Sequence, residues 1–317
     1  MITTNWQWNT NILASSSSKT NMISFKEYFD QMLIWKEKET ALSTYQNYRS
    51  VYNHFVPILG NCPLADISGP LIDTIFDQLN IKTSSRKTYR LILSALFNDA
   101  IRQEILEKNP CHNMRKIRQN HFKIDLRLPS RAEIQQYIQK ARNERNHFIY
   151  KVLLLAVSTG MRLGEILNLT TNDIDFKNHT IEIKGQLTQA GPDMPLKTSK
   201  SYRKIFVAKE ILREIRKYTL GLYIFTPNRF PFKQISRHTA DKYIYHFFKR
   251  LDTPEGFTFH SLRHYHATEL VRRGIDIKEV SKRLGHASIY ITADFYTHWV
   301  DDMDMVAADI MGKGWIV

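Results

Sequence analysis

The chain has 317 residues, enough for about two domains of ~150 residues each. Hydrophobic residues make up 43% and charged residues 24% of it, which is typical of a globular rather than a disordered protein. Lysine and arginine number 45 against 31 acidic residues, giving a net charge of +14, and this excess favours a polyanionic partner such as nucleic acid or an anionic membrane surface. The longest unbroken apolar run near the middle, 152–157, falls far short of the ~18 residues that span a bilayer. The two cysteines exclude a disulfide framework and a cysteine-based zinc site.

The first third of the chain predicts a flexible lead-in followed by a small helical unit. Residues 1–22 are rich in serine, threonine and asparagine, so we expect a flexible N-terminal segment. Residues 23–112 show helical periodicity and predict four helices. These helices are expected from residue 25, from Ser43 with a Ser43/Gln46 capping box, over 71–79 and over 85–104. The glycines and prolines of 57–70 predict the break between the second and third helices, and the stripe of Tyr45, Tyr48 and Tyr52 predicts core packing.

The rest of the chain predicts a basic linker and a second domain of mixed structure. Residues 113–126 hold four lysine and arginine residues against one acid and show no clear period, so we interpret them as an inter-domain linker. A second domain over 127–317 would open with a capping box between Ser130 and Glu133. Alternation over 180–184 and again over 203–207 predicts two strands among helices. The expected fold class is therefore mainly α with a small antiparallel β-sheet (α+β).

A basic run at the start of the fourth predicted helix could bind phosphate. Backbone N–H groups and the helix dipole favour anions at such a position, and hydroxyls add neutral donors. The alternative is an ordinary solvated helix face. The candidate DNA-binding residues in this run and in the linker are Lys82, Thr83, Ser84, Arg86, Lys87, Arg90, Arg115, Lys116 and Arg118.

Three polar segments of the second domain stand out as candidate catalytic elements. They are 158–169 (STGMRLGEILNL), 260–268 (HSLRHYHAT) and 284–288 (LGHAS), and a tyrosine, Tyr296, follows ten residues after His286. Taken singly, each has a plain structural explanation: an i,i+3 ion pair, packing, or a metal-binding histidine pair at i,i+4. No carboxylate or cysteine near the histidine pair completes a metal site, so we expect no metal.

Taken together, the segments resemble the tyrosine recombinase (phage integrase) family. The ordered pattern T-G-x-R-x-x-E, H-x-L-R-H, L-G-H and a late tyrosine is specific, and the resemblance covers roughly 127–317. The preceding helical unit is similar to the core-binding domain of that family. The resemblance thus implies a two-domain DNA clamp, with a helical core-binding domain and a catalytic domain.

The resemblance also implies a role for each residue of the pattern. Two arginines, Arg162 and Arg263, would clamp the phosphate with forked donors. Tyr296 would attack phosphorus to give a 3′-phosphotyrosyl enzyme and a free 5′-hydroxyl, with Tyr290 as the alternative nucleophile. The histidines His260 and His286 would donate hydrogen bonds or help to move the proton of the nucleophile.

Two further roles concern the leaving group and the second layer of the site. A hairpin lysine would protonate the leaving oxygen: Lys197 fits best and Lys200 competes, because hairpin registers slip easily. Glu165 would orient Arg162 without touching DNA. No cofactor and no ATP are implied, because the covalent intermediate conserves the bond energy.

The implied partners are double-stranded recombination sites and other copies of the chain, in the bacterial cytoplasm near the nucleoid and away from membranes. Four protomers would act together, and accessory DNA-bending proteins could assist them. The stripe of Met303, Val306, Ala307 and Ile310 predicts a short tail helix that packs on its own domain or on a neighbour. The leading hypothesis is an integrase of a phage or other mobile element. The alternatives are a Xer-type resolvase, an integron-type integrase, and a non-catalytic DNA-binding protein that retains the fold.

Overall fold

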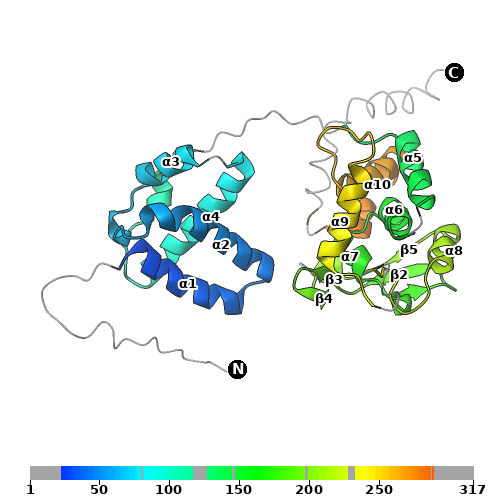
Figure 1. The fold of residues 1–317 in the computed structure, drawn as a ribbon, viewed down its shortest axis with the longest axis horizontal. Helices are drawn as coiled ribbons and strands as arrows, with labels where there is room; N and C mark the ends of the chain where they lie inside the picture. Colours follow the sequence, from blue (N-terminus) through cyan, green and yellow to red (C-terminus); the bar gives the residue numbers. More distant parts are fainter. Residues whose placement is uncertain are drawn as a thin grey trace, which may run out of the picture. The chain divides into compact units, whose positions relative to one another are not determined.

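The computed structural model describes residues 23–79, 81–116, 127–144, 147–196, 199–227, 233–286 and 288 (Figure 1). It divides into two compact units, 1–120 and 121–317, which are considered separately. The predictions for the N-terminal segment, Arg118, Lys197, Tyr290, Tyr296 and the tail helix lie outside the described residues. Within those residues, every helix is too short or too polar to cross a membrane.

Four α-helices build the described part of the first unit, as the periodicity predicted: α1 (Phe25–Glu39), α2 (Leu42–Leu59), α3 (Gly69–Gln78) and α4 (Thr83–Arg102). Two 3-10 turns, η2 (Leu64–Asp66) and η3 (Pro110–Asn113), complete its described part. Aromatic rings fill the core. Phe25 lies edge-on to Phe29 with ring centroids 5.5 Å apart, and Phe55 lies edge-on to Phe76 with ring centroids 5.3 Å apart. The described helices are thus joined around one apolar centre.

The limits of α2 differ from the prediction at both ends. The helix begins at Leu42 after Ala41, which makes no side-chain cap, so the predicted start and capping box at Ser43 are wrong. Pro57 lies inside the helix, which continues to Leu59. Phe55 and Leu59 are both buried in the core on either side of Pro57, and their packing outweighs the hydrogen bond that a proline cannot donate. The predicted core position of Tyr48 is confirmed, whereas Tyr52 is half-buried against Phe29.

The chain leaves the first unit through a tightly bound segment. Arg90 of α4 donates to the carbonyls of Arg115 at 2.7 Å, Cys111 at 3.1 Å and Met114 at 3.5 Å. The Arg115 backbone N–H donates to Asp73 at 2.8 Å and its guanidinium to Asp77 at 2.6 Å, and the Met114 side chain is buried. Met114 and Arg115, which belong to the predicted linker, therefore pack on the helical unit.

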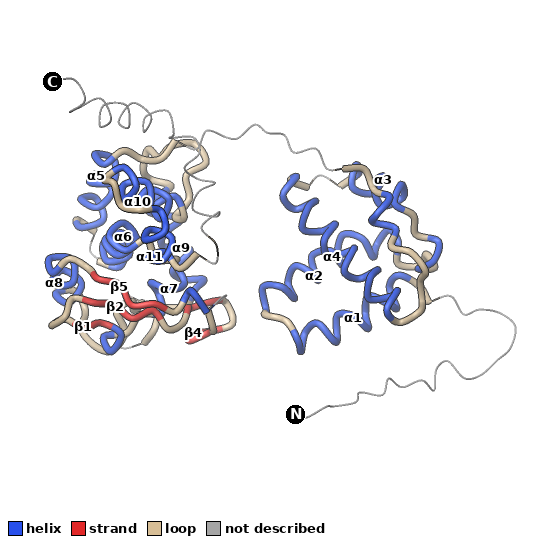
Figure 2. The backbone as a smooth tube through the Cα atoms, turned by 180° about the vertical axis from the view of Figure 1, so that it is seen from behind, coloured by secondary structure: helices blue, strands red, loops and turns tan. Residues whose placement is uncertain are grey.

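The second unit is built around α6 (Phe148–Thr159), which is buried along most of its length. The other α-helices described here are α5 (Arg131–Arg142), α7 (Leu163–Asn168), α8 (Lys209–Lys217), α9 (Arg237–Phe248), α10 (Ser261–Arg272) and α11 (Ile277–Leu284). The predicted capping box is confirmed, since Ser130 accepts from the Glu133 N–H and Glu133 accepts from the Ser130 N–H. Figures 1 and 2 show α6 and α10 on one side of the unit and the strands on the other.

Within the residues that the structure describes, the strands form two small antiparallel sheets. In the first, β2 (Thr180–Ile183) pairs with β5 (Arg203–Phe206) in the register Ile181 to Ile205, which confirms the two predicted strands, and β1 (Ile174–Asp175) adds to the other edge of β2. The hairpin of β3 (Gln186–Thr188) and β4 (Gly191–Met194) was not predicted. The β4 sequence GPDM has low strand propensity, and reciprocal bonds between Asn168 and Asp193, 2.9 and 2.8 Å long, hold it in place. Two 3-10 turns, η4 (Thr171–Asp173) and η5 (Ser199–Ser201), lie before β1 and β5.

We predict that Arg90→Met destabilises the protein by about 1–3 kcal/mol, because it leaves partly buried carbonyls without their donors. Lys87→Met, an exposed change on the same helix, is the matched control and should stay within about 0.5 kcal/mol of wild type. Urea unfolding with amide exchange over 111–116 measures both. Equal, small effects of the two changes would show that Arg90 does not anchor this segment.

Candidate active site

The end of α6 brings the three predicted segments together. Gly160 ends this helix in the left-handed conformation with φ of 65°. A Cβ atom there would lie 2.6 Å from both His266 Cδ2 and Leu284 Cδ2, so only glycine allows α10 and the end of α11 to approach this closely. The first segment therefore packs directly on the second and third.

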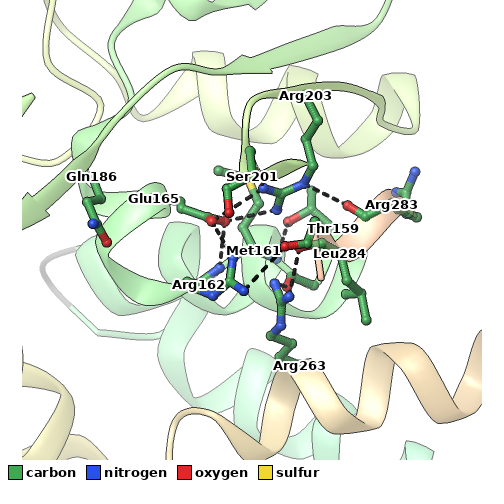
Figure 3. A network of polar contacts seen from close by, with 12 residues as sticks. Thr159, Met161, Arg162, Glu165, Gln186, Ser201, Arg203, Arg263, Arg283 and Leu284 are labelled. Carbon is green, nitrogen blue, oxygen red and sulfur yellow. Dashed lines mark hydrogen bonds and ion pairs between the residues drawn. The ribbon is translucent and has the colours of Figure 1, made fainter. Parts of the chain in front are cut away.

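Arg263 joins the same three elements by hydrogen bonds. Its Nη1 donates to the Gly160 carbonyl at 2.6 Å and its Nη2 to the Leu284 carbonyl at 2.7 Å, and the side chain is buried. Arg162 precedes α7, and its Nη2 donates to the Gly285 carbonyl at 3.4 Å. Because Leu284 and Gly285 are consecutive, the guanidiniums of Arg162 and Arg263 are held beside each other (Figure 3).

Glu165 lies behind Arg162 and is only 1% exposed. Its carboxylate accepts from the Arg162 backbone N–H at 3.0 Å and from Arg162 Nη1 at 2.9 Å. Arg203 of β5 donates to both carboxylate oxygens, at 2.9 and 3.3 Å. Burial alone would raise the pKa of Glu165, but the bonds and charge of Arg203, then of Arg162, lower it below its ordinary value. The bond between Arg162 Nη1 and Glu165 is the contact that the predicted orienting role of Glu165 requires.

The histidines surround the same arginines. The rings of His260 and His264 lie perpendicular, with centroids 4.8 Å apart. Burial, followed by the charges of Arg263 and Arg162, lowers the pKa of His286 to about 4. The pKa of His260 is lowered by the same three causes. Both rings are therefore neutral near pH 7, and each can donate through one nitrogen and accept through the other. Among the described residues, no three histidine, cysteine or acidic side chains are grouped so that they could hold a metal ion.

Sequence reasoning missed two partly buried arginines of this site. Arg203 contacts Glu165, and Arg283 donates to His266 at 3.2 Å and to the Ser158 carbonyl at 3.0 Å. For Arg203 a signal existed: in the alternating strand it shares a face with Ile205, which is buried. A basic residue on the inward face of a strand indicates a buried partner. For Arg283 the sequence offers no comparable signal.

The predicted phosphate-binding residues of the first unit divide into two groups. Lys82, Thr83, Ser84, Lys87 and Lys116 are exposed. The side chains of Arg86, Arg90 and Arg115 instead bind backbone carbonyls or Asp77 within the unit. An open groove of about 640 Å³ lies along α4 and is lined by Lys87, Arg90, Leu91, Ser94, Cys111 and His112. In the second unit, Lys200 lies exposed in η5.

The buried His266 and the half-buried His264 and His286 make stability depend on pH. His264, His266 and His286 each have a pKa of about 4, lowered mainly by burial, against an ordinary value of 6.5. Between these values the unfolded chain binds more protons than the folded one, so the free energy of unfolding should fall as the pH drops from about 6.5 towards 4.

His266→Asn should reduce the slope of the free energy of unfolding against pH. The reduction corresponds to up to one proton, or about 1.4 kcal/mol per pH unit. Asparagine can still donate to the Val157 carbonyl that His266 Nδ1 contacts at 2.7 Å, but it does not titrate. Urea unfolding at a series of pH values checks this. An unchanged slope would mean that His266 does not contribute.

Comparison with known proteins agrees with this geometry. Residues 130–302 match the model described as "Phage integrase family", and residues 24–117 match "Phage integrase SAM-like domain". The chain is 27% identical to the ICEBs1 integrase of Bacillus subtilis over 92% of this chain and 83% of that protein. It is 32% identical to the integrase of Staphylococcus phage L54a over 46% of each chain.

Two solved structures share the fold. The Tn1549 transposon integrase in complex with transposon right end DNA is 18% identical, with a TM-score of 0.75 over 90% of this chain and 100% of that one. A lambda integrase tetramer bound to a Holliday junction is 21% identical, with a TM-score of 0.70 over 90% of this chain and 83% of that one. With the motif order, the site geometry and the family match over more than half of its length, the chain belongs to the phage integrase family of tyrosine recombinases.

Proposed function

We propose that this recombinase is the integrase of a mobile element and that it cuts DNA through a phosphotyrosyl intermediate formed at Tyr296. One observation supports the proposal above all: consecutive carbonyls at the end of α11 hold Arg162 and Arg263 beside each other, with His286 next in the chain. Two adjacent guanidiniums are well suited to the two non-bridging oxygens of a phosphodiester.

The charge balance of the site favours an anion. In the described part of the site, Arg162 and Arg203 bind the carboxylate of Glu165, whereas Arg263 and Arg283 bind backbone carbonyls. Backbone carbonyls orient these cations but do not neutralise them. Positive charge fixed in a partly buried site stabilises the additional negative charge of a phosphoryl transition state.

The proposed reaction is an in-line exchange at phosphorus. The Tyr296 oxygen forms a bond to phosphorus while the bond to the 5′-oxygen of DNA breaks, which leaves a 3′-phosphotyrosyl link and a 5′-hydroxyl. Lys197 supplies the proton to that oxygen, with Lys200 as the alternative donor. His260 and His286, neutral near pH 7, donate to the phosphate or take the tyrosine proton. The reverse exchange rejoins DNA without ATP.

Relatives from mobile elements support the integrase role. Besides the integrases above, transposase A from transposon Tn554 of Staphylococcus aureus is 30% identical over 58% of this chain and 51% of that protein. A 26% identical relative named tyrosine recombinase XerC-like, from Caldanaerobacter subterraneus, matches 85% of the chain, so a Xer-type resolvase is the second candidate. Because the chain belongs to this enzyme family, we do not favour the alternative of a non-catalytic DNA-binding protein that retains the fold.

The proposed partner is double-stranded DNA carrying recombination sites. Lambda integrase, which shares the fold, was solved as a tetramer on a Holliday junction, and we propose four protomers for this chain as well. In the first unit, the exposed Lys82, Lys87 and Lys116 are the cations best placed for phosphate contacts, because Arg86, Arg90 and Arg115 already bind groups within the unit.

Tyr296→Phe should bind DNA normally and form no covalent adduct, because the change removes only the nucleophilic oxygen. Trapping on a nicked recombination site, followed by denaturing electrophoresis, measures the adduct. Tyr290→Phe is the matched control and should form adduct at the wild-type rate. An adduct with the Tyr296 variant and none with the Tyr290 variant would move the nucleophile to Tyr290.

Lys197→Ala should slow cleavage of ordinary DNA far more than Lys200→Ala does. Sulfur in place of the 5′ bridging oxygen leaves readily without a proton, so such a substrate should rescue the variant that lacks the general acid. Rescue confined to Lys200→Ala would assign the proton donor to Lys200.

A further inference from the structure

Three successive carbonyls at the C-terminal end of α11 each accept a hydrogen bond from a different arginine. Arg283 O accepts from Arg203 Nε at 2.7 Å, Leu284 O from Arg263 Nη2 at 2.7 Å, and Gly285 O from Arg162 Nη2 at 3.4 Å. The last carbonyls of a helix lack partners within the helix and carry the negative end of its dipole. The end of α11 is therefore a fixed acceptor array for the cations of the site.

Arg203 is the member of this array that links it to Glu165. Its Nη2 and Nη1 donate to the two carboxylate oxygens, Nη1 also donates to the Ser201 carbonyl at 2.8 Å, and Nε donates to Arg283 O. The side chain is only 7% exposed. Figure 3 shows the Arg203 guanidinium between Glu165 and the Arg283 carbonyl.

The surroundings of Arg203 are shaped for a planar guanidinium. Gly285 adopts the left-handed conformation with φ of 69°, and a Cβ there would lie 2.9 Å from Arg203 Nη1. Any larger residue would press on the guanidinium. Lysine has a single cationic centre and cannot donate to a carboxylate and to a carbonyl on the other side of the plane in one fixed arrangement.

We propose that Arg203 is a positioning residue of the recombination reaction: it holds Glu165 and the end of α11 at a fixed separation and so sets the direction of the Arg162 guanidinium. This inference rests on the proposed function, in which Arg162 binds the scissile phosphate. Arg203 itself does not touch DNA. Its effect reaches the reaction through Glu165, which holds Arg162 from behind.

The test compares Arg203→Lys and Arg203→Met with wild type on a nicked half-site that traps the covalent adduct. Lys204→Met is the matched control, because it removes a cation from the next position of β5, where the side chain is exposed. Half-site Kd, the adduct-forming rate at saturating DNA, and the folded fraction from circular dichroism at the assay temperature are measured for each. Arg203→Lys keeps the charge and serves if Arg203→Met fails to fold.

We expect both Arg203 variants to keep the half-site Kd within about twofold and to lose adduct-forming rate per folded molecule by about 10- to 100-fold, the effect of a misplaced reacting group. Lys204→Met should match wild type. Full rate in folded Arg203→Lys, or a loss that disappears after correction for the folded fraction, would overturn the proposal. No adduct with wild type would instead contradict the proposed function.

A double-mutant cycle separates positioning from general loss of structure. If Arg203 acts through Glu165, then Arg203→Lys combined with Glu165→Gln should slow adduct formation no more than the larger single change does. Multiplying effects would show that Arg203 acts independently of Glu165, and the proposal would then be wrong.

Discussion

The site depends on holding several guanidiniums close together against their mutual repulsion. Two unit charges about 4 Å apart repel by roughly 4 kcal/mol in a partly buried setting. Glu165 offsets part of this repulsion between Arg162 and Arg203, and carbonyls at the ends of α6 and α11 orient Arg162, Arg203 and Arg263. Holding these guanidiniums together lowers the free energy of unfolding. The binding of an anion between them offsets this loss.

The same contacts explain why the short motifs have their form. Glycine is required at 160 because α10 and α11 approach it closely, and at 285 because a guanidinium packs against it. Glutamate is required at 165 because it is buried between two arginines. Several residues of the motifs are therefore explained by packing and by buried ion pairs, and not only by the chemistry of the reaction.

Much of this could be predicted from the sequence, because the signals are local. The capping box at Ser130, the strands at 180–183 and 203–206 and the ordered motif letters each depend on a few neighbouring residues. The β3–β4 hairpin could not be predicted, since distant bonds from Asn168 hold a sequence with low strand propensity. The partners of Arg90 were also hidden, because a charge run does not show which cations bind groups within their own unit. For Arg203, the inward face of its strand did indicate a buried partner. The roles assigned to the reacting residues stay predictions.

The most direct test of a preorganised phosphate site is a pair of crystal structures, of the protein alone and bound to an uncleaved half-site. In both, Arg162 and Arg263 should keep their bonds to the Gly285 and Leu284 carbonyls, and in the complex both guanidiniums should contact the same phosphate. Guanidiniums that leave these carbonyls when DNA binds, or that contact different phosphates, would contradict the preorganised site.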